Sequence, residues 1–277
     1  MEDILDLFYL GFYTKVVNEG ASAKNPSEDV ELAVLRARLA LGQVDFVINA
    51  CKNSSSPIHK GAIILANCLK IKNFEKIQEY LLENIDKSLK TMSSHYSICV
   101  GLGYMIAEEY NDALECLHGV IHQDAAALRV QCLLSLERVD LAEEEIESIT
   151  SNSLKAICNG IIGLKKDQNS TKTALYSLLD MSERYQLSPL LGSLIASCHF
   201  AIGEWEQGQS TILIASEKYP NDDSIMINSV LSGLRVADFA KMKSDIALIN
   251  SNNSIYAQNI QKLLEDFDET AERITSQ

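Results

Sequence analysis

Residues 190–220, LLGSLIASCHFAIGEWEQGQSTILIASEKYP, decide the fold of this chain. Apolar side chains recur at helical spacing from Leu191 to Ile202, and Gly203 interrupts that pattern. A second apolar face runs from Trp205 to Ala215, and Pro220 follows it. The stretch therefore predicts two short amphipathic helices that are joined by a tight turn.

This arrangement is typical of the tetratricopeptide repeat, a helix–turn–helix unit of about 34 residues. With Pro189 counted as position 1, Gly203 takes position 15, Trp205 takes position 17 and Gly208 takes position 20. The aromatic residue that is usual at position 11 is replaced by His199, which we interpret as a packed core histidine.

The same pattern recurs along the chain at intervals of 29 to 36 residues. Position 20 is small or apolar because the second helix of a unit meets the first helix there. The position-20 residues are Val16, Val47, Ile77, Ala113, Ala142, Ala174 and Gly208. The position-17 residues are Tyr13, Val44, Phe74, Tyr110, Val139, Thr173 and Trp205. The longest interval predicts an enlarged turn at residues 90–94, and residues 165–172 are predicted to form a polar loop.

The ends of the chain depart from the pattern, as terminal repeats do when they cover the apolar face of a neighbour. The first leading helix would begin before Met1, residues 225–234 predict another leading helix, and the helices predicted at 240–249 and 255–274 are atypical. We therefore predict an all-α fold, a right-handed superhelical solenoid of tetratricopeptide-like repeats. Residues 1–277 would form a single domain of about seven to eight helix pairs, capped by atypical helices.

Composition and charge narrow the classes of function. The chain has 38 acidic and 24 basic residues, and its net charge of −14 disfavours binding to nucleic acid or directly to anionic membranes. It shows no secretory signal pattern and no long uninterrupted apolar run, so we expect a cytoplasmic protein. Seven cysteines are scattered over helix faces, which suits small buried residues in a reducing compartment.

A search for catalytic or metal-binding patterns gives no site. Gly101 and Gly103 lack the third glycine of a dinucleotide-binding loop and are explained by close helix packing. Cys116, His118 and His122 have helical spacing, but no second cysteine or carboxylate pair completes a metal site. We therefore predict a protein that is not an enzyme and has no cofactor and no bound metal.

The concave surface of such an array is the predicted binding site, because its leading helices line a long groove. Here the lining is mostly apolar, which suits a helix or extended segment of a permanent partner. The predicted partner-binding residues are Leu39, Leu69, Ile98, Leu102, Met105, Gln131, Leu134 and Phe200. Alternatively, these side chains pack inside a tightly wound superhelix. A cytosolic adaptor or co-chaperone that clamps peptide tails is less favoured, because such arrays present Lys, Arg and Asn in the groove.

Three stretches, in order, resemble the epsilon subunit of coatomer, the coat of COPI vesicles. They are LDLFYLGFYTKVVNEG at 5–20, ALRVQCLLSLERVDLAEEEIESI at 127–149 and GSLIASCHFAIGEWEQGQSTILIASEKYPND at 192–222. The resemblance covers nearly the full length, although the loop CKNSSSPIHK at 51–60 and the region after residue 238 depart from the family.

The resemblance implies a non-enzymatic coat component that binds the carboxyl-terminal domain of the coatomer alpha subunit. The complex would also contain the beta-prime subunit, and a small GTPase would recruit the coat to Golgi membranes for retrograde transport to the endoplasmic reticulum. The protein would then be cytoplasmic and peripheral on Golgi and COPI vesicle membranes, which it would reach only through the assembled coat.

Overall fold

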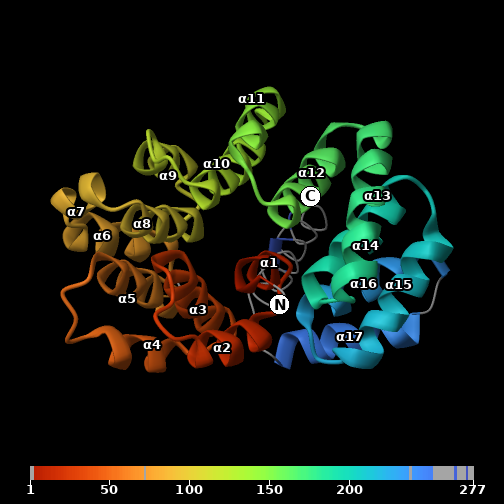
Figure 1. Cartoon of the computed structure of the whole chain (residues 1–277). Coiled ribbons are helices and arrows are strands. Elements are labelled where there is room, and N and C mark those ends of the chain that lie inside the picture. Colours follow the sequence, from red (N-terminus) through yellow and green to blue (C-terminus); the bar gives the residue numbers. More distant parts are fainter. Residues whose placement is uncertain (1–2, 72, 237–238, 252–264, 267–272, 274–277) are drawn as a thin grey trace. The chain divides into compact units, whose positions relative to one another are not determined.

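The computed structural model describes residues 3–71, 73–236, 239–251, 265, 266 and 273. Across these residues every regular element is a helix, and sequential helices pack in pairs (Figure 1). The predicted all-α repeat fold is therefore confirmed. The chain divides into two compact units, Met1–Ser177 and Leu178–Gln277. The prediction of one continuous domain concerns both units together and stays a prediction.

The first unit contains helices α1 to α12 and the start of α13. Their bounds are α1 Ile4–Tyr9, α2 Tyr13–Ser22, α3 Glu28–Ala40, α4 Val44–Cys51, α5 Pro57–Lys70, α6 Phe74–Asn84, α7 Lys87–Met92, α8 Ser94–Ile106, α9 Tyr110–Leu117, α10 Gln123–Ser135, α11 Val139–Glu145 with the short 3₁₀ helix η1 Ile146–Ser148, α12 Asn152–Lys166 and α13 Gln168–Tyr185. The second unit contains the end of α13 and then α14 Pro189–Ala201, α15 Trp205–Lys218, α16 Asp223–Val236 and α17 Phe239–Ser251. Within the described ranges these helices make eight successive pairs, and α7 stands between two of them.

One backbone turn recurs at the end of the leading helices. The residue at position 15 has a positive φ, and its N–H bonds to the carbonyl three residues earlier. The next N–H bonds to the carbonyl five residues earlier, as in Gly203 N to Phe200 O (3.1 Å) and Glu204 N to His199 O (2.9 Å). This is the Schellman motif, which ends a helix and reverses the chain within a few residues. It is found at Gly11, Gly42, Glu108, Glu137 and Gly203.

The predicted register of the repeats is confirmed by where the second helices begin. Six of the position-17 residues are the first residue of a helix, namely Tyr13, Val44, Phe74, Tyr110, Val139 and Trp205. The position-20 residues are all buried, in keeping with the close approach of the two helices. Among the position-17 residues, only Thr173 does not begin a helix, because it lies inside α13.

Two predicted loops are wrong, and a local cap explains each. The loop predicted at 165–172 shrinks to one residue, because Asp167 Oδ1 accepts bonds from the N–H groups of Asn169 (2.8 Å) and Ser170 (2.9 Å) and starts α13 early. The turn predicted at 90–94 overlaps helix α7. Asp86 Oδ1 caps that helix by accepting from Ser88 N at 2.9 Å.

Helix α1 connects the beginning of the first unit to its last complete helix, α12. It packs against α2 and α3, and also against α12, a helix more than a hundred residues further along the chain (Figure 1). Leu7 and Leu10 have no exposed surface. The sequence predicts that this six-residue leading helix is incomplete. In the structure its buried side chains nevertheless connect distant repeats.

Buried cysteines and a buried histidine complete the core as predicted. All seven cysteines are buried and free. Burial raises the pKa of the Cys99 and Cys158 thiols to about 12, so they stay protonated and unreactive at neutral pH. His199 is buried and its Nδ1 lies 2.8 Å from Glu204 Oε2.

The predicted helices near the carboxyl terminus have mixed outcomes. The helices at 225–234 and 240–249 correspond to α16 and α17. Nearly all of the helix predicted at 255–274 lies outside the described residues.

The recurrent turn generates a stability prediction at Glu108, which has φ 60° and is not glycine. Because a side chain in this conformation costs about 1 kcal/mol, Glu108→Gly should raise the free energy of unfolding by up to that amount. Gly42→Ala should lower it by about 1 kcal/mol, since φ is 74° and no other atom would clash with the added methyl group.

Urea denaturation of the full chain measures both effects. Glu108→Ala is the matched control, because it removes the carboxylate but keeps the unfavourable backbone conformation. If Glu108→Ala stabilises the protein as much as Glu108→Gly, the explanation by backbone strain is wrong.

Candidate functional site

A cluster of ionisable side chains joins three leading helices of the first unit. Asp29 lies in the first turn of α3, His95 in the first turn of α8, and His122 caps the start of α10. Asp29 Oδ1 is 2.7 Å from His95 Nε2 and 3.0 Å from His122 Nε2. The two imidazole rings meet edge to face with their centroids 5.5 Å apart. One carboxylate oxygen therefore holds together helices from three different repeats.

A second carboxylate extends the cluster to helix α1. Asp124 Oδ1 accepts a hydrogen bond of 2.7 Å from the hydroxyl of Tyr9, and Asp124 Oδ2 pairs with the guanidinium of Arg36. That guanidinium also lies over the ring of Phe8, 4.7 Å from its centroid. Asp124 is buried, so its charge depends on these two partners.

The electrostatics of the cluster keep the Tyr9 hydroxyl protonated and the Asp29 carboxyl ionised. Burial raises the pKa of the Tyr9 phenol, and the neighbouring charge of Asp124 raises it further, so the hydroxyl remains a donor. Partial burial would raise the pKa of Asp29, but the hydrogen bonds from His95 and His122 outweigh burial and lower it below its usual value. Asp29 is therefore ionised at neutral pH.

This cluster is absent from the sequence prediction, which grouped His122 with Cys116 and His118. His118 is exposed and Cys116 is buried in the core. His122 instead meets Asp29, which lies 93 residues away in the sequence, and His95 meets the same residue over 66 positions. Spacing within one helix cannot reveal contacts between repeats.

The predicted partner-binding residues fall into three groups. Leu39, Ile98 and Leu134 are buried in the core of the first unit. Leu102, Met105 and Gln131 are half-buried on α8 and α10, whereas Leu69 on α5 is 45% exposed. Phe200 belongs to the second unit, where its ring stacks on Trp205 with centroids 5.1 Å apart. The four residues with accessible surface in the first unit lie on neighbouring leading helices, because α5 packs on α8 and α8 packs on α10.

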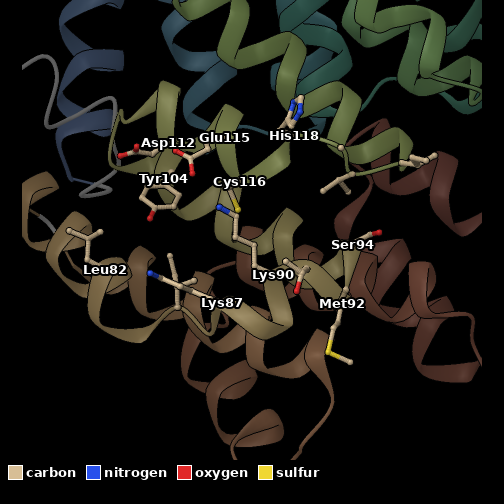
Figure 2. Close-up of a pocket in the computed structure, with 16 residues that line it drawn as sticks. Leu82, Lys87, Lys90, Met92, Ser94, Tyr104, Asp112, Glu115, Cys116 and His118 are labelled. Atoms are coloured by element: carbon tan, nitrogen blue, oxygen red, sulfur yellow. The ribbon is translucent and has the colours of Figure 1, made fainter.

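A cleft of about 900 Å³ is lined by residues of α7 and α9, by Leu82 of α6, by Tyr104 of α8 and by residues 118–121 after α9 (Figure 2). Lys87 and Lys90 stand on one side of it, and Asp112 and Glu115 stand on the other. The lining also includes large apolar side chains in contact with solvent, among them Met92 at 80% exposure and Ile121 at 98%.

The cleft suits a protein contact, because apolar side chains are flanked by charges of both signs. The sequence prediction missed this cleft because it assigned residues 90–94 to a turn. Met92, an apolar residue within that polar stretch, was the available indication.

Comparison with known proteins agrees with the repeat scaffold. The sequence profile described as coatomer epsilon subunit matches residues 3–275. The chain belongs to the coatomer epsilon subunit family. This is a family of subunits of the COPI vesicle coat rather than of enzymes, and the resemblance found in the sequence is confirmed.

Curated relatives are similar over most of their length. Coatomer subunit epsilon of Dictyostelium discoideum is 25% identical over 250 residues, which cover 83% of each chain. Coatomer subunit epsilon-2 of Arabidopsis thaliana is 22% identical over 275 residues, which cover 96% of this chain and 94% of the relative. Among the helices in the described ranges, none has the length and apolar character needed to cross a bilayer.

The geometry of Asp29 predicts a pH-dependent loss of stability in Asp29→Asn. A carboxylate whose pKa is lowered by folding stabilises the native state above its unfolded pKa of about 4, and that stabilisation is lost as pH falls through the folded pKa. Asp29→Asn should therefore lower the free energy of unfolding by about 1 kcal/mol at pH 7, a value discounted for partial exposure. The difference from the wild type should shrink as the pH falls below about 4.

Chemical denaturation over a series of pH values tests this prediction. Asp45→Asn is the matched control, because Asp45 pairs with Lys70 on an exposed surface and should contribute little. An equal loss in both variants, or a loss in Asp29→Asn that does not depend on pH, contradicts the role given to Asp29.

Proposed function

We propose that the protein is a non-enzymatic structural subunit of the COPI coat that binds the carboxyl-terminal domain of the coatomer alpha subunit. It would act in a complex that also contains the beta-prime subunit and would support retrograde transport from the Golgi to the endoplasmic reticulum. It would be cytoplasmic and would reach Golgi and vesicle membranes only through the assembled coat. The observation that carries this proposal is the family match over residues 3–275 on a helical repeat scaffold.

The exposed part of the predicted binding face is the proposed contact with the alpha subunit. Leu69, Leu102, Met105 and Gln131 present accessible surface on the adjoining helices α5, α8 and α10. Three of the four are apolar, which suits burial against a permanent partner. The buried residues Leu39, Ile98 and Leu134 would support this face from the core rather than touch the partner.

The cleft beside α7 is a second proposed contact within the same coat. Its occupant would be an amphipathic segment of another coat subunit, with an apolar side chain against Met92 and Ile121. Acidic groups of that segment would face Lys87 and Lys90, and basic groups would face Asp112 and Glu115. This charge complementarity would fix the direction in which the segment lies.

The alternative, an adaptor that clamps peptide tails, is less well supported. Such a clamp needs free basic groups in the groove to bind a terminal carboxylate. Arg36, a basic residue of the leading helix α3, is already paired with Asp124 and packed on Phe8. Its guanidinium is therefore occupied by contacts within the chain and does not serve as a free basic group for a peptide carboxylate.

Leu69→Glu tests the proposed alpha-subunit contact. Adding a charge to an apolar interface should weaken binding of the purified carboxyl-terminal domain of the alpha subunit at least about tenfold, without loss of the fold, because Leu69 is already 45% exposed. Tyr176→Glu on α13 is the matched control, since Tyr176 is an exposed apolar residue of the same unit outside the predicted face.

Binding is measured by calorimetry with the purified domain, and tagged full-length chain is recovered from cell extract at low and high salt. Recovery of the whole coat that survives high salt supports the proposed function. Recovery of chaperones that are lost at high salt would favour the adaptor instead. Equal binding by Leu69→Glu and the wild type would contradict the proposed face.

A double variant, Met92→Asp with Ile121→Asp, tests the cleft. Both side chains are largely exposed, so the fold should tolerate the change, while recovery of at least one other coat subunit should fall severalfold. Ile214→Asp with Leu213→Asp is the control pair, since both residues are exposed on α15. Unchanged recovery of every coat subunit would show that the cleft is not a contact within the coat.

A further inference from the structure

We propose that Asp29, His95 and His122 form a binding site for one divalent transition-metal ion such as Zn²⁺. One ligand atom from each residue can be chosen so that all three lie within 4.8 Å of one another. Asp29 lies on α3, His95 lies on α8 and His122 is the N-cap residue of α10, so the ion would join three repeats of the first unit. Water would take the remaining coordination position.

The distances suit coordination after a small opening of the cluster. A tetrahedral Zn²⁺ holds nitrogen and oxygen ligands at about 2.0–2.2 Å, which separates the ligand atoms by about 3.3–3.5 Å. Asp29 Oδ1 lies 2.7 Å from His95 Nε2 and 3.0 Å from His122 Nε2. Asp29 Oδ1 therefore needs to move away from the two histidine nitrogens by less than about 1 Å.

The far side of each imidazole faces a carboxylate. His95 Nδ1 lies 3.5 Å from Glu28 Oε2, and His122 Nδ1 lies 3.8 Å from Asp124 Oδ1. Histidines that bind metals commonly donate their other N–H to a carboxylate, which fixes the ring and strengthens the ligand. Both rings thus direct one nitrogen towards the proposed ion and have a carboxylate oxygen within 3.8 Å of the other nitrogen.

Proton positions change when the ion binds. In the structure, His122 Nδ1 accepts from the backbone N–H of Asp124 at 3.1 Å, so Nε2 carries the proton that faces Asp29. Coordination through Nε2 moves the ring proton to Nδ1, so the ring must turn from the backbone N–H of Asp124 towards Asp124 Oδ1, which lies 3.8 Å from Nδ1 without the ion. The backbone N–H of Asp124 then loses its side-chain acceptor, a cost that the metal–ligand bond would have to offset.

Charge and burial also favour a cation. Arg36 pairs with Asp124, whereas Asp29 and Glu28 face two histidines that are neutral in the form that binds metal. The site then carries surplus negative charge. The histidine side chains are 12% and 16% exposed and that of Asp29 is 43% exposed, so solvent can supply the water in the remaining coordination position. Two imidazoles and one carboxylate suit Zn²⁺ or Co²⁺ better than Mg²⁺ or Ca²⁺, which prefer oxygen ligands.

The experiment titrates the full-length chain, freed of metal by a chelator, with Zn²⁺ by calorimetry and with Co²⁺ by visible absorption. The wild type should bind one ion and show the bands of four-coordinate Co²⁺ without the charge-transfer absorption of a thiolate ligand. His95→Gln should abolish binding, and Glu28→Gln should weaken it about 10- to 100-fold. His118→Gln is the matched control, because His118 is exposed and lies outside the cluster.

Thermal unfolding provides a second readout. Zn²⁺ should raise the Tm of the wild type and of His118→Gln, and should leave the Tm of His95→Gln unchanged. Absence of saturable binding to the wild type, thiolate absorption with Co²⁺, or full affinity in His95→Gln would overturn the proposal. If His95→Gln does not fold, the affinity of Glu28→Gln for Zn²⁺ is the deciding measurement. Glu28 is largely exposed in the first turn of α3, so this variant should fold. An affinity equal to that of the wild type would then overturn the proposal.

Discussion

The fold depends on one backbone constraint, the turn with positive φ that ends a leading helix. At Gly11, Gly42, Glu108, Glu137 and Gly203 the same pair of hydrogen bonds stops one helix and sets the direction of the next. Two amphipathic helices are then antiparallel and close enough to bury their apolar faces against each other. That two of these five positions carry glutamate shows that the repeat tolerates strain where the turn is required.

Contacts between distant repeats connect parts of the first unit that nearest-neighbour packing does not connect. In a simple solenoid each unit touches only its neighbours, so its ends are held weakly. Here helix α1 reaches α12, Tyr9 donates to Asp124 across 115 positions, and Ser151 donates to Asp6 across 145. The buried charge of Asp124 is compensated only when these repeats come together. Separating these repeats would therefore leave the buried carboxylate of Asp124 without its partners, which is strongly unfavourable.

The sequence predicts local features of this protein better than features that depend on several repeats. Helix pairs and register follow from the spacing of apolar residues, so Trp205 and its counterparts begin helices where expected. A single carboxylate was enough to overturn the loop predicted near Asp167, because capping competes with loop composition over one turn. Repeat position identifies the inward face but not how closely adjacent helices pack, which is why Ile98 is buried while Leu69 is exposed. The cluster around Asp29 was beyond prediction, because Asp29 reaches His95 and His122 only through the packing of non-adjacent repeats.

The division between buried and exposed side chains is consistent with a structural role in a coat. The reactive groups named above are shielded from solvent, since the seven thiols are buried and the carboxylate of Asp124 is paired with Arg36 and Tyr9. Apolar side chains such as Leu69, Met92 and Ile121 instead remain in contact with solvent, although the chain carries a net charge of −14. The negative charge keeps such a surface soluble and opposes contact with phosphate-rich membranes and nucleic acids. It leaves association with other proteins as the main route by which these apolar side chains can be buried, which is what a family of coat subunits requires.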